Sequence, residues 1–216
     1  MGLKLYDYWR SSASYRLRIA LHLKGVAFEA VQIDLHPKVK QHMSAAYRAL
    51  TPQMRVPAIE VDGQVFAQST AILEWIEETW PDPSLLPKDP LERLKVRGFA
   101  HTITSDVHPL NNPSVLNRLR TEFGADPDAI SRWYSDWIRR AFAPLEQTAN
   151  DTTGDFLFGD GPGMAEICLV PQLYNARRFD VDVSDFPRLL SVDAACRALP
   201  AFQAAAPEAS RPVTAS

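Results

Sequence analysis

The amino-acid sequence predicts an α/β domain followed by an all-helical domain. Segments with strand and helix periodicity alternate over residues 1–80, whereas strand signals almost disappear after residue 90. Between these parts, residues 80–90 contain four prolines in eleven positions, a density that neither a helix nor an inner strand accommodates. We therefore expect one domain over residues 1–80, a linker over residues 81–90 and a helical domain over residues 91–216.

The first domain is expected to contain a βαβ unit followed by a ββα unit. A helical pattern ends at Gly25 and a strand pattern follows at once, which indicates a parallel crossover. Two later strands flank Asp62-Gly63, a strong hairpin signal, and Ser69 begins the next helix. The expected strands cover residues 3–8, 27–34, 57–61 and 64–67. This order of elements is typical of a thioredoxin-like domain.

The second domain is expected to be a helical bundle. One apolar stripe with helical spacing indicates an amphipathic helix whose aromatic side chains lie in the core. The prolines at 109 and 113 interrupt another helical pattern and indicate a kink or break. Further helices are expected from about residue 164 to 178 and from 187 to 199, and the tail after Pro207 is expected to fray. The stripe consists of Ile130, Trp133, Tyr134, Trp137, Ile138 and Phe142.

Composition narrows the classes of function. A net charge of −3 and a pI of about 6.0 provide no overall positive field, so we do not expect binding to nucleic acid. Cys168 and Cys196 lie in apolar helical segments and are expected to be buried free thiols. The five histidines show no metal-ligand spacing, so we expect no metal. Because the chain has neither a targeting segment nor a membrane-length apolar stretch, we expect a cytoplasmic protein that does not bind membranes.

One long motif follows the first expected strand and reads Tyr8-Trp9-Arg10-Ser11-Ser12-Ala13-Ser14-Tyr15-Arg16-Leu17-Arg18-Ile19-Ala20-Leu21. This motif resembles the signature of the zeta-class glutathione transferases, in which a Ser-Ser-Cys-Ser-like turn precedes an Arg-x-Arg helix. The resemblance covers residues 3 to about 205 and implies a glutathione transferase fold, glutathione as the cofactor, a small dicarboxylate substrate and a homodimer. The family includes both maleylacetoacetate and maleylpyruvate isomerases.

Ser11 is the expected activator of the glutathione thiol. Lowering a thiol pKa of about 8.5 by about two units requires roughly 2.7 kcal/mol of thiolate stabilisation. A helix N-terminus supplies only about 0.3–1 kcal/mol, whereas a hydroxyl hydrogen bond to the anion adds about 1.5–3 kcal/mol. From the residues alone, Ser11, Ser12 and Ser14 could instead cap the helix, and Tyr8 is a rival donor. Ala13 stands where the family usually has cysteine.

Three other segments are expected to bind glutathione. Val56-Pro57 resembles the family's cis-proline turn, whose backbone would pair with the cysteinyl part of glutathione; taken alone, it would indicate only an extended loop. Gln68-Ser69 precedes a helix whose free N–H groups suit the γ-glutamyl carboxylate, although an ordinary helix cap is the alternative. His42 would approach the glycine end or would simply be solvated.

The substrate carboxylates are expected to meet arginines. Arg10 lies beside the thiolate turn, and Arg178 matches the family's Asn-Ala-x-Arg-Phe segment. Arg16 is a further candidate. For Arg177 and Arg178 alone, a solvated or salt-bridged helix face would be the common interpretation.

The segment from His108 to Ser114 contains conflicting indications of the substrate. The resemblance places His108, Asn112 and Ser114 near glutathione. His108-Pro109 with Asn111-Asn112 is similar to maleylpyruvate isomerases, whereas Ser114-Val115-Leu116 is similar to maleylacetoacetate isomerases. Family members commonly have Thr and Asp in the segment that matches residues 163–166, where this chain has Gly163 in place of a capping hydroxyl.

The resemblance implies that the chain isomerises maleylacetoacetate to fumarylacetoacetate by reversible thiolate addition. Maleylpyruvate isomerisation is the first alternative, and a transferase acting on small halogenated acids is the second. A non-catalytic interaction domain with the same fold is an alternative from a different class.

Overall fold

The computed structural model describes residues 2–212 and contains two compact units. The first unit comprises residues 2–84 together with residues 199–212, and the second comprises residues 85–198. The division after Ser84 falls inside the proline-rich segment.

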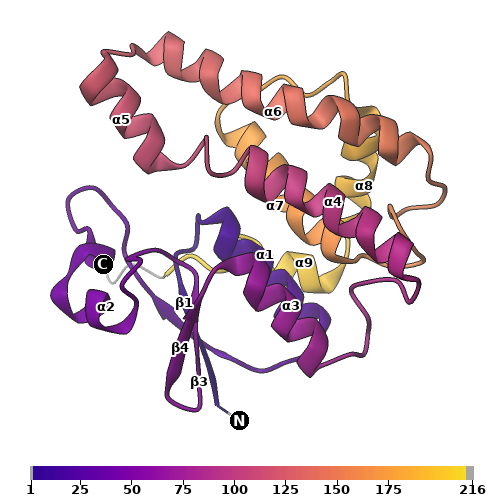
Figure 1. Ribbon diagram of the computed structural model, residues 1–216, viewed down its shortest axis with the longest axis horizontal. Helices are drawn as coiled ribbons and strands as arrows, with labels where there is room; N and C mark the ends of the chain where they lie inside the picture. Colours follow the sequence, from indigo (N-terminus) through magenta and orange to yellow (C-terminus); the bar gives the residue numbers. More distant parts are fainter. Residues whose placement is uncertain (1, 213–216) are drawn as a thin grey trace. The chain divides into compact units, whose positions relative to one another are not determined.

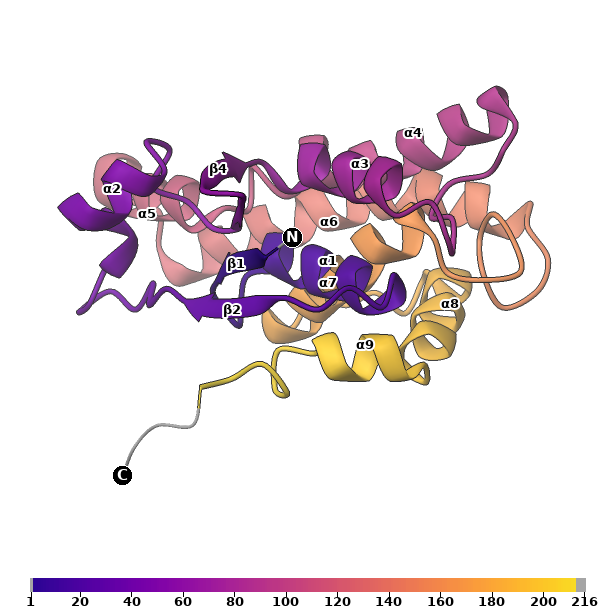
Figure 2. The same ribbon diagram turned by 90° about the horizontal axis from the view of Figure 1, so that it is seen from below.

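A four-stranded mixed sheet forms the centre of the first unit (Figure 1). The strand order is β2-β1-β3-β4, with β1 parallel to β2 and antiparallel to β3; Figure 2 shows β1 and β2 side by side. The turn between β3 and β4 has positive φ at both Asp62 and Gly63, as a two-residue hairpin requires. The predicted thioredoxin-like arrangement is therefore confirmed. The strands are β1 (Leu3–Asp7), β2 (Glu29–Gln32), β3 (Ala58–Val61) and β4 (Gln64–Ala67).

The two faces of the sheet are buried by different residues. Leu5 pairs with Ile59, and both are almost fully buried. On the opposite face, Tyr6 and Ala58 pack in a cluster with Tyr47 of α2. The helices of this unit are α1 (Ser12–Leu23), the 3-10 turn η1 (Gln41–Met43), α2 (Ala45–Leu50), α3 (Ser69–Thr79) and α9 (Pro200–Ala205).

The last helix, α9, packs against α1 in the first unit. Its Phe202 and Ala205 are buried, and the Ala205 carbonyl accepts a hydrogen bond from Arg18 of α1. This position differs from the predicted helical domain over residues 91–216, because contacts distant in sequence assign α9 to the first unit. The tail after Pro207 is described to residue 212.

The second unit is all-helical within residues 85–198. Pro113 follows the expected break between α4 and α5. In the predicted apolar stripe of α6, four residues are buried, but Trp133 and Trp137 are only half-buried. They lie at the edge of the stripe, where Trp133 Nε1 donates to the Leu110 carbonyl at 3.0 Å. The helices are α4 (Pro90–Asp106), α5 (Pro113–Phe123), α6 (Pro127–Asn150), α7 (Met164–Arg178) and α8 (Pro187–Arg197).

Three further sequence predictions concern cysteines, metals and membranes. Cys168 and Cys196 are both buried, and neither forms a disulfide bond within the described residues, as expected. Among residues 2–212, no group of histidine, cysteine or acidic side chains is arranged to hold a metal ion. No helix in the same range is both long and apolar enough to span a bilayer.

Candidate active site

Ser11 lies in the turn between β1 and α1 and is the N-cap of α1. Its Oγ accepts a hydrogen bond from the Ser14 N–H at 3.2 Å, and its own N–H donates to the Tyr8 carbonyl at 2.8 Å. Capping uses one lone pair of the oxygen, so the hydroxyl proton remains able to point toward an anion. The two interpretations of Ser11, helix cap and thiolate partner, are therefore compatible.

The other residues of the turn face the interior. Ser12, Ala13 and Ser14 are buried, and the Ser14 hydroxyl has no hydrogen-bond partner among the described residues. The Ser14 N–H is already bound to the Ser11 Oγ, so a contact of Ser14 with glutathione, like that of Ser12, stays a prediction. The rival donor Tyr8 is half-buried, and its ring centroid lies 6.2 Å from that of Trp9.

The Val56-Pro57 peptide bond is cis, as the resemblance implies. The preceding loop is held by the buried Tyr47 side chain, whose hydroxyl donates to the Arg55 carbonyl at 2.9 Å. Within residues 2–212, the Val56 N–H and carbonyl have no backbone hydrogen-bond partner. The backbone of Val56 is thus available to pair with a peptide-like ligand.

The N-terminus of α3 has the properties of an anion site. Gln68 precedes α3 with φ 77° and ψ 101°, and its side chain forms no capping hydrogen bond with the helix. The Gln68 side chain instead donates to Gln53 Oε1 at 2.8 Å. The free N–H groups of the first turn, together with the helix dipole, favour a carboxylate at this position.

Arg16 lies beneath this helix end rather than at the surface. Its side chain is almost fully buried, and Nη1 is 3.4 Å from the Ser69 Oγ, to which it donates. The buried guanidinium adds positive charge next to the N-terminus of α3. A contact of Arg16 with the substrate stays a prediction.

The guanidinium groups of two arginines lie close to the Trp9 ring. The Arg10 guanidinium lies 4.3 Å from the Trp9 ring centroid, and Arg211 of the C-terminal segment lies 5.2 Å from it. Both arginines are exposed, and neither forms an ion pair with a carboxylate of residues 2–212. The contact between Arg211 and Trp9 could not be predicted, because nothing in the sequence of the Ala/Pro/Ser-rich tail indicates which side chain Arg211 contacts.

Comparisons with known proteins identify the family. A family model described as the N-terminal domain of glutathione S-transferase matches residues 10–79. The chain is 46% identical over 209 residues to a maleylpyruvate isomerase of Ralstonia sp, covering 96% of this chain and 98% of the relative. It is 45% identical over 206 residues to a maleylacetoacetate isomerase of Pseudomonas aeruginosa, covering 95% and 96% of the two chains.

Among solved structures, this chain is similar to the holo form of a maleylpyruvate isomerase described as a bacterial zeta-class glutathione S-transferase. The TM-score is 0.93 at 46% identity, covering 98% of this chain and 100% of that one. This chain belongs to the zeta-class glutathione transferases. A maleylacetoacetate isomerase of Anaeromyxobacter dehalogenans with bound glutathione is also similar, with a TM-score of 0.85, 43% identity and 96% of each chain covered. Glutathione is the cofactor of this zeta-class family.

The zeta-class residues predicted in the second unit fall into two groups. Asn112 is the N-cap of α5, and its Oδ1 accepts bonds from the Ser114 N–H at 3.0 Å and the Ser114 hydroxyl at 2.8 Å. Asn112 and Ser114 thus stabilise the start of α5. The predicted contact of these two residues with glutathione stays a prediction. His108 follows α4, where its N–H donates to the Ile103 carbonyl at 3.0 Å, and its role in glutathione binding is also still a prediction.

Two neighbouring arginines at the end of α7 differ in their surroundings. Arg177 forms an ion pair with Asp193, which matches the interpretation of a salt-bridged helix face. Arg178 is exposed, lies 5.0 Å from the Phe179 ring centroid and has no carboxylate partner among the described residues. The residue that matches the zeta-class segment is therefore the one left available for an anion.

His42 occupies the 3-10 turn η1 and is half-buried. Burial lowers the pKa of the imidazole below its ordinary value, and Nδ1 has no hydrogen-bond partner within residues 2–212. A neutral imidazole with an unused nitrogen can donate to or accept from a ligand at the glycine end of glutathione.

Proposed function

We propose that this chain is a glutathione-dependent cis–trans isomerase that converts maleylacetoacetate to fumarylacetoacetate. The observation that carries the proposal is the Ser11 hydroxyl at the N-terminus of α1, in a chain that is 45% identical to a maleylacetoacetate isomerase. That hydroxyl and the helix dipole act together on one sulfur atom, which lowers the thiol pKa.

Glutathione binds along the edge of the first unit in this proposal. Its cysteinyl backbone pairs with Val56 at the cis-proline turn, and its γ-glutamyl carboxylate occupies the uncapped N-terminus of α3 at Gln68 and Ser69. His42 meets the glycine end. The free Val56 backbone, the absence of a side-chain cap on α3 within the described chain and the glutathione-bound relative support this arrangement.

The reaction proceeds by addition, rotation and elimination. The thiolate forms a C–S bond to the cis alkene, and the π electrons move onto the conjugated carbonyl to give an enolate. The former double bond is then single and rotates. The enolate electrons return, the C–S bond breaks, and the trans product leaves with the thiolate regenerated. No proton or electron is consumed overall.

Arginine provides the charge stabilisation in this reaction. Arg10 is exposed beside the turn, and its guanidinium lies over the Trp9 ring rather than against a carboxylate of residues 2–212. We assign Arg10 to a substrate carboxylate or the enolate oxygen. Arg178 is assigned to another substrate carboxylate on the basis of its match to the zeta class.

Maleylpyruvate isomerisation is the second candidate. The chain is 46% identical to a maleylpyruvate isomerase and 45% identical to a maleylacetoacetate isomerase, so identity does not separate the two substrates. The His108-Pro109 and Asn111-Asn112 pairs favour this second candidate.

The deciding experiment is side-by-side turnover of both maleyl compounds by the purified protein, with and without glutathione. A higher kcat/KM for maleylacetoacetate that depends on glutathione supports the first candidate, and a higher value for maleylpyruvate transfers the assignment to the second. Arg10→Ala serves as the substrate-site control and should raise KM for the preferred compound. Activity on neither compound would remove the isomerase proposal and favour a transferase or a non-catalytic protein.

We also propose a cytoplasmic homodimer. Leu91 and Leu94 of α4 are 68% and 65% exposed, and residues three apart on a helix lie on one face. An exposed pair of this kind suits burial against a second copy. Light scattering should give twice the chain mass for the wild type and one chain mass for the Leu91→Glu/Leu94→Glu variant; a monomeric wild type would contradict the proposal.

A further inference from the structure

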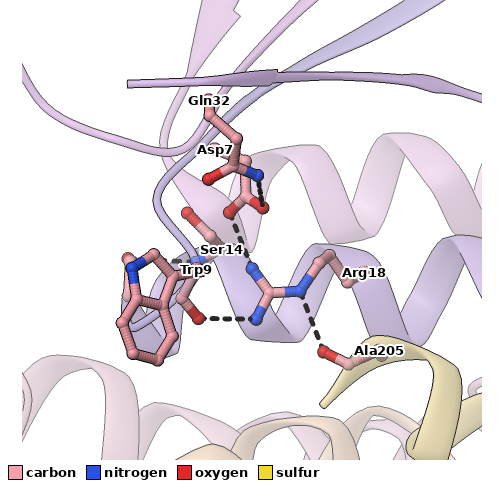
Figure 3. A network of polar contacts seen from close by, with 7 residues as sticks. Asp7, Trp9, Ser14, Arg18, Gln32 and Ala205 are labelled. Atoms are coloured by element: carbon pink, nitrogen blue, oxygen red, sulfur yellow. Dashed lines mark hydrogen bonds and ion pairs between the residues drawn. The ribbon is translucent and has the colours of Figure 1, made fainter. Parts of the chain in front are cut away.

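Arg18 joins three separate parts of the first unit (Figure 3). Its Nη1 donates to Asp7 Oδ1 at 2.7 Å, its Nη2 to the Trp9 carbonyl at 3.0 Å, and its Nε to the Ala205 carbonyl at 2.9 Å. These acceptors belong to the end of β1, to the turn before α1 and to α9. One planar guanidinium therefore fixes three backbone segments relative to one another.

The ion pair between Arg18 and Asp7 is buried. The side chain of Arg18 is 2% exposed and that of Asp7 is 0% exposed. The second Asp7 oxygen accepts from Gln32 Nε2 at 3.1 Å, which anchors the carboxylate to β2. A buried pair of opposite charges remains in place because each charge loses its partner if the other moves.

The contact with Trp9 controls the backbone directly before Ser11. A peptide unit is planar, so holding the Trp9 carbonyl also orients the N–H of Arg10. The next N–H, that of Ser11, is already bound to the Tyr8 carbonyl at 2.8 Å. The ring of the same Trp9 carries the Arg10 guanidinium at 4.3 Å. Fixing Trp9 thus places both the hydroxyl and the arginine that the proposed reaction uses.

We propose that Arg18, held by Asp7, is a positioning residue for the thiol-activating turn, and that α9 takes part through the Ala205 carbonyl. This inference rests on the glutathione site of the proposed function. Arg18 and Asp7 touch neither glutathione nor substrate in this proposal; they determine where Ser11 and Arg10 stand. The C-terminal helix therefore serves the chemistry of the first unit.

A second buried ion pair in the same unit provides a matched control. Lys24 Nζ lies 2.6 Å from Glu77 Oε2, with side chains 0% and 6% exposed, and also donates to the Pro83 carbonyl at 2.7 Å. Lys24 lies at the C-terminal end of α1, and its ion pair with Glu77 connects α1 to α3. Both pairs contribute to the stability of the unit, but only the Arg18 pair reaches the turn.

The test compares Arg18→Lys, Arg18→Met and Lys24→Met in the full chain. Each variant is measured by urea unfolding, by the ultraviolet absorbance of bound glutathione thiolate as a function of pH, and by kcat. Lysine preserves the charge that Asp7 needs but its single ammonium group cannot reach three divergent acceptors. Comparing Arg18→Lys with Arg18→Met therefore separates the positioning of the turn from the loss of a charge.

We expect all three variants to unfold at lower urea than the wild type. Only the two Arg18 variants should raise the pKa of the bound thiol and lower kcat, by about tenfold to a hundredfold, because small displacements of reacting groups have effects of that size. Lys24→Met should keep the wild-type thiolate titration. If Arg18→Lys titrates like the wild type, or if Lys24→Met raises the thiol pKa equally, the proposal is wrong.

Two further results keep the test decisive. If Arg18→Met does not fold, Arg18→Lys and Asp7→Asn answer the same question, since the amide leaves the Arg18 charge unbalanced and the turn less firmly held; an unchanged thiol pKa in both would overturn the proposal. If the wild type binds glutathione as a thiolate but isomerises neither maleyl compound, the proposed function fails while the titration still decides the role of Arg18.

Discussion

Replacing Ser11 should have two separable effects, because the structure gives its hydroxyl oxygen one task and the proposed reaction gives its proton another. As N-cap, the Oγ accepts from the Ser14 N–H, and loss of such a cap to alanine costs about 0.5–2 kcal/mol of stability. As thiolate partner, the same hydroxyl donates to sulfur. Ser11→Ala removes both interactions, whereas Ser11→Gly removes the donor and costs only a few tenths of a kcal/mol as a cap.

The size of the effect on the thiol follows from the hydrogen bond. A bond to a charged group is worth about 1.5–3 kcal/mol, which corresponds to about one to two pKa units. If the bound thiol titrates at about 6.5 in the wild type, it should titrate at about 7.5–8.5 in either variant. At pH 7 the thiolate fraction then falls about threefold to twenty-fivefold, and the rate falls with it.

The assay is the pH dependence of bound thiolate absorbance and of kcat/KM in Ser11→Ala and Ser11→Gly. The lost rate should return as the pH rises above the new thiol pKa, since the ionised sulfur is then restored without the hydroxyl. Urea unfolding should show Ser11→Ala to be the less stable variant. A thiolate titration that matches the wild type in both variants would refute the role of Ser11, and Tyr8→Phe would then test the rival donor.

Three other predictions follow from the site and the core. Ser69→Ala should raise the Kd for glutathione about tenfold to a hundredfold by calorimetry, because a hydrogen bond to a carboxylate is lost, and leave the thiol pKa unchanged; a Kd within twofold of the wild type would contradict it. Cys168 and Cys196 should resist iodoacetamide in the native protein and react in denaturant, as judged by mass spectrometry, because both are buried and burial raises the pKa of Cys196. Gly163→Thr should lower the urea midpoint, because a Cβ at this position would lie 2.7 Å from the Leu85 carbonyl oxygen.

Much of the fold could be predicted because its signals are local. The Asp62-Gly63 pair determines a hairpin by its own conformation, and the short connection from a helix to the strand after Gly25 favours a parallel crossover. The cis bond before Pro57 was predicted from the resemblance. The serines of the turn are predicted both as helix caps and as ligand-binding residues, since a helix N-terminus favours a capping hydroxyl and also binds anions.

The burial of two arginines in α1 could not be predicted from the sequence. Arg16 and Arg18 sit two apart on α1, and their spacing alone does not reveal that both are buried. Their burial depends on acceptors far away in sequence, at Ser69 for Arg16 and at Asp7 and Ala205 for Arg18. Such pairings exist only once the chain is folded, so the buried network could not be found from periodicity.

The assignment of α9 to the first unit also could not be predicted, because it depends on contacts between residues far apart in sequence. The sequence of α9 is alanine-rich and helical, which is consistent with a place in either unit. The contacts that decide its position come from α1, including the Arg18 side chain. Because α1 begins directly after Ser11, the packing of the C-terminal helix and the geometry of the thiol-activating turn share one element, and a change in either is expected to affect the other.

At Gly163, the usual preference for a hydroxyl side chain at a helix N-cap is outweighed by the close approach of the Leu85 carbonyl oxygen. A Cβ at this N-cap of α7 would lie 2.7 Å from the Leu85 carbonyl oxygen, which already accepts the Met164 N–H at 2.9 Å. Threonine would regain a few tenths of a kcal/mol as a cap, but overpacking costs about 1–3 kcal/mol, and a backbone oxygen cannot rotate away. The expected order of urea midpoints is glycine, then threonine, then alanine, which has the clash without the cap; a threonine variant more stable than the wild type would show that the Leu85 segment yields more easily than this geometry implies.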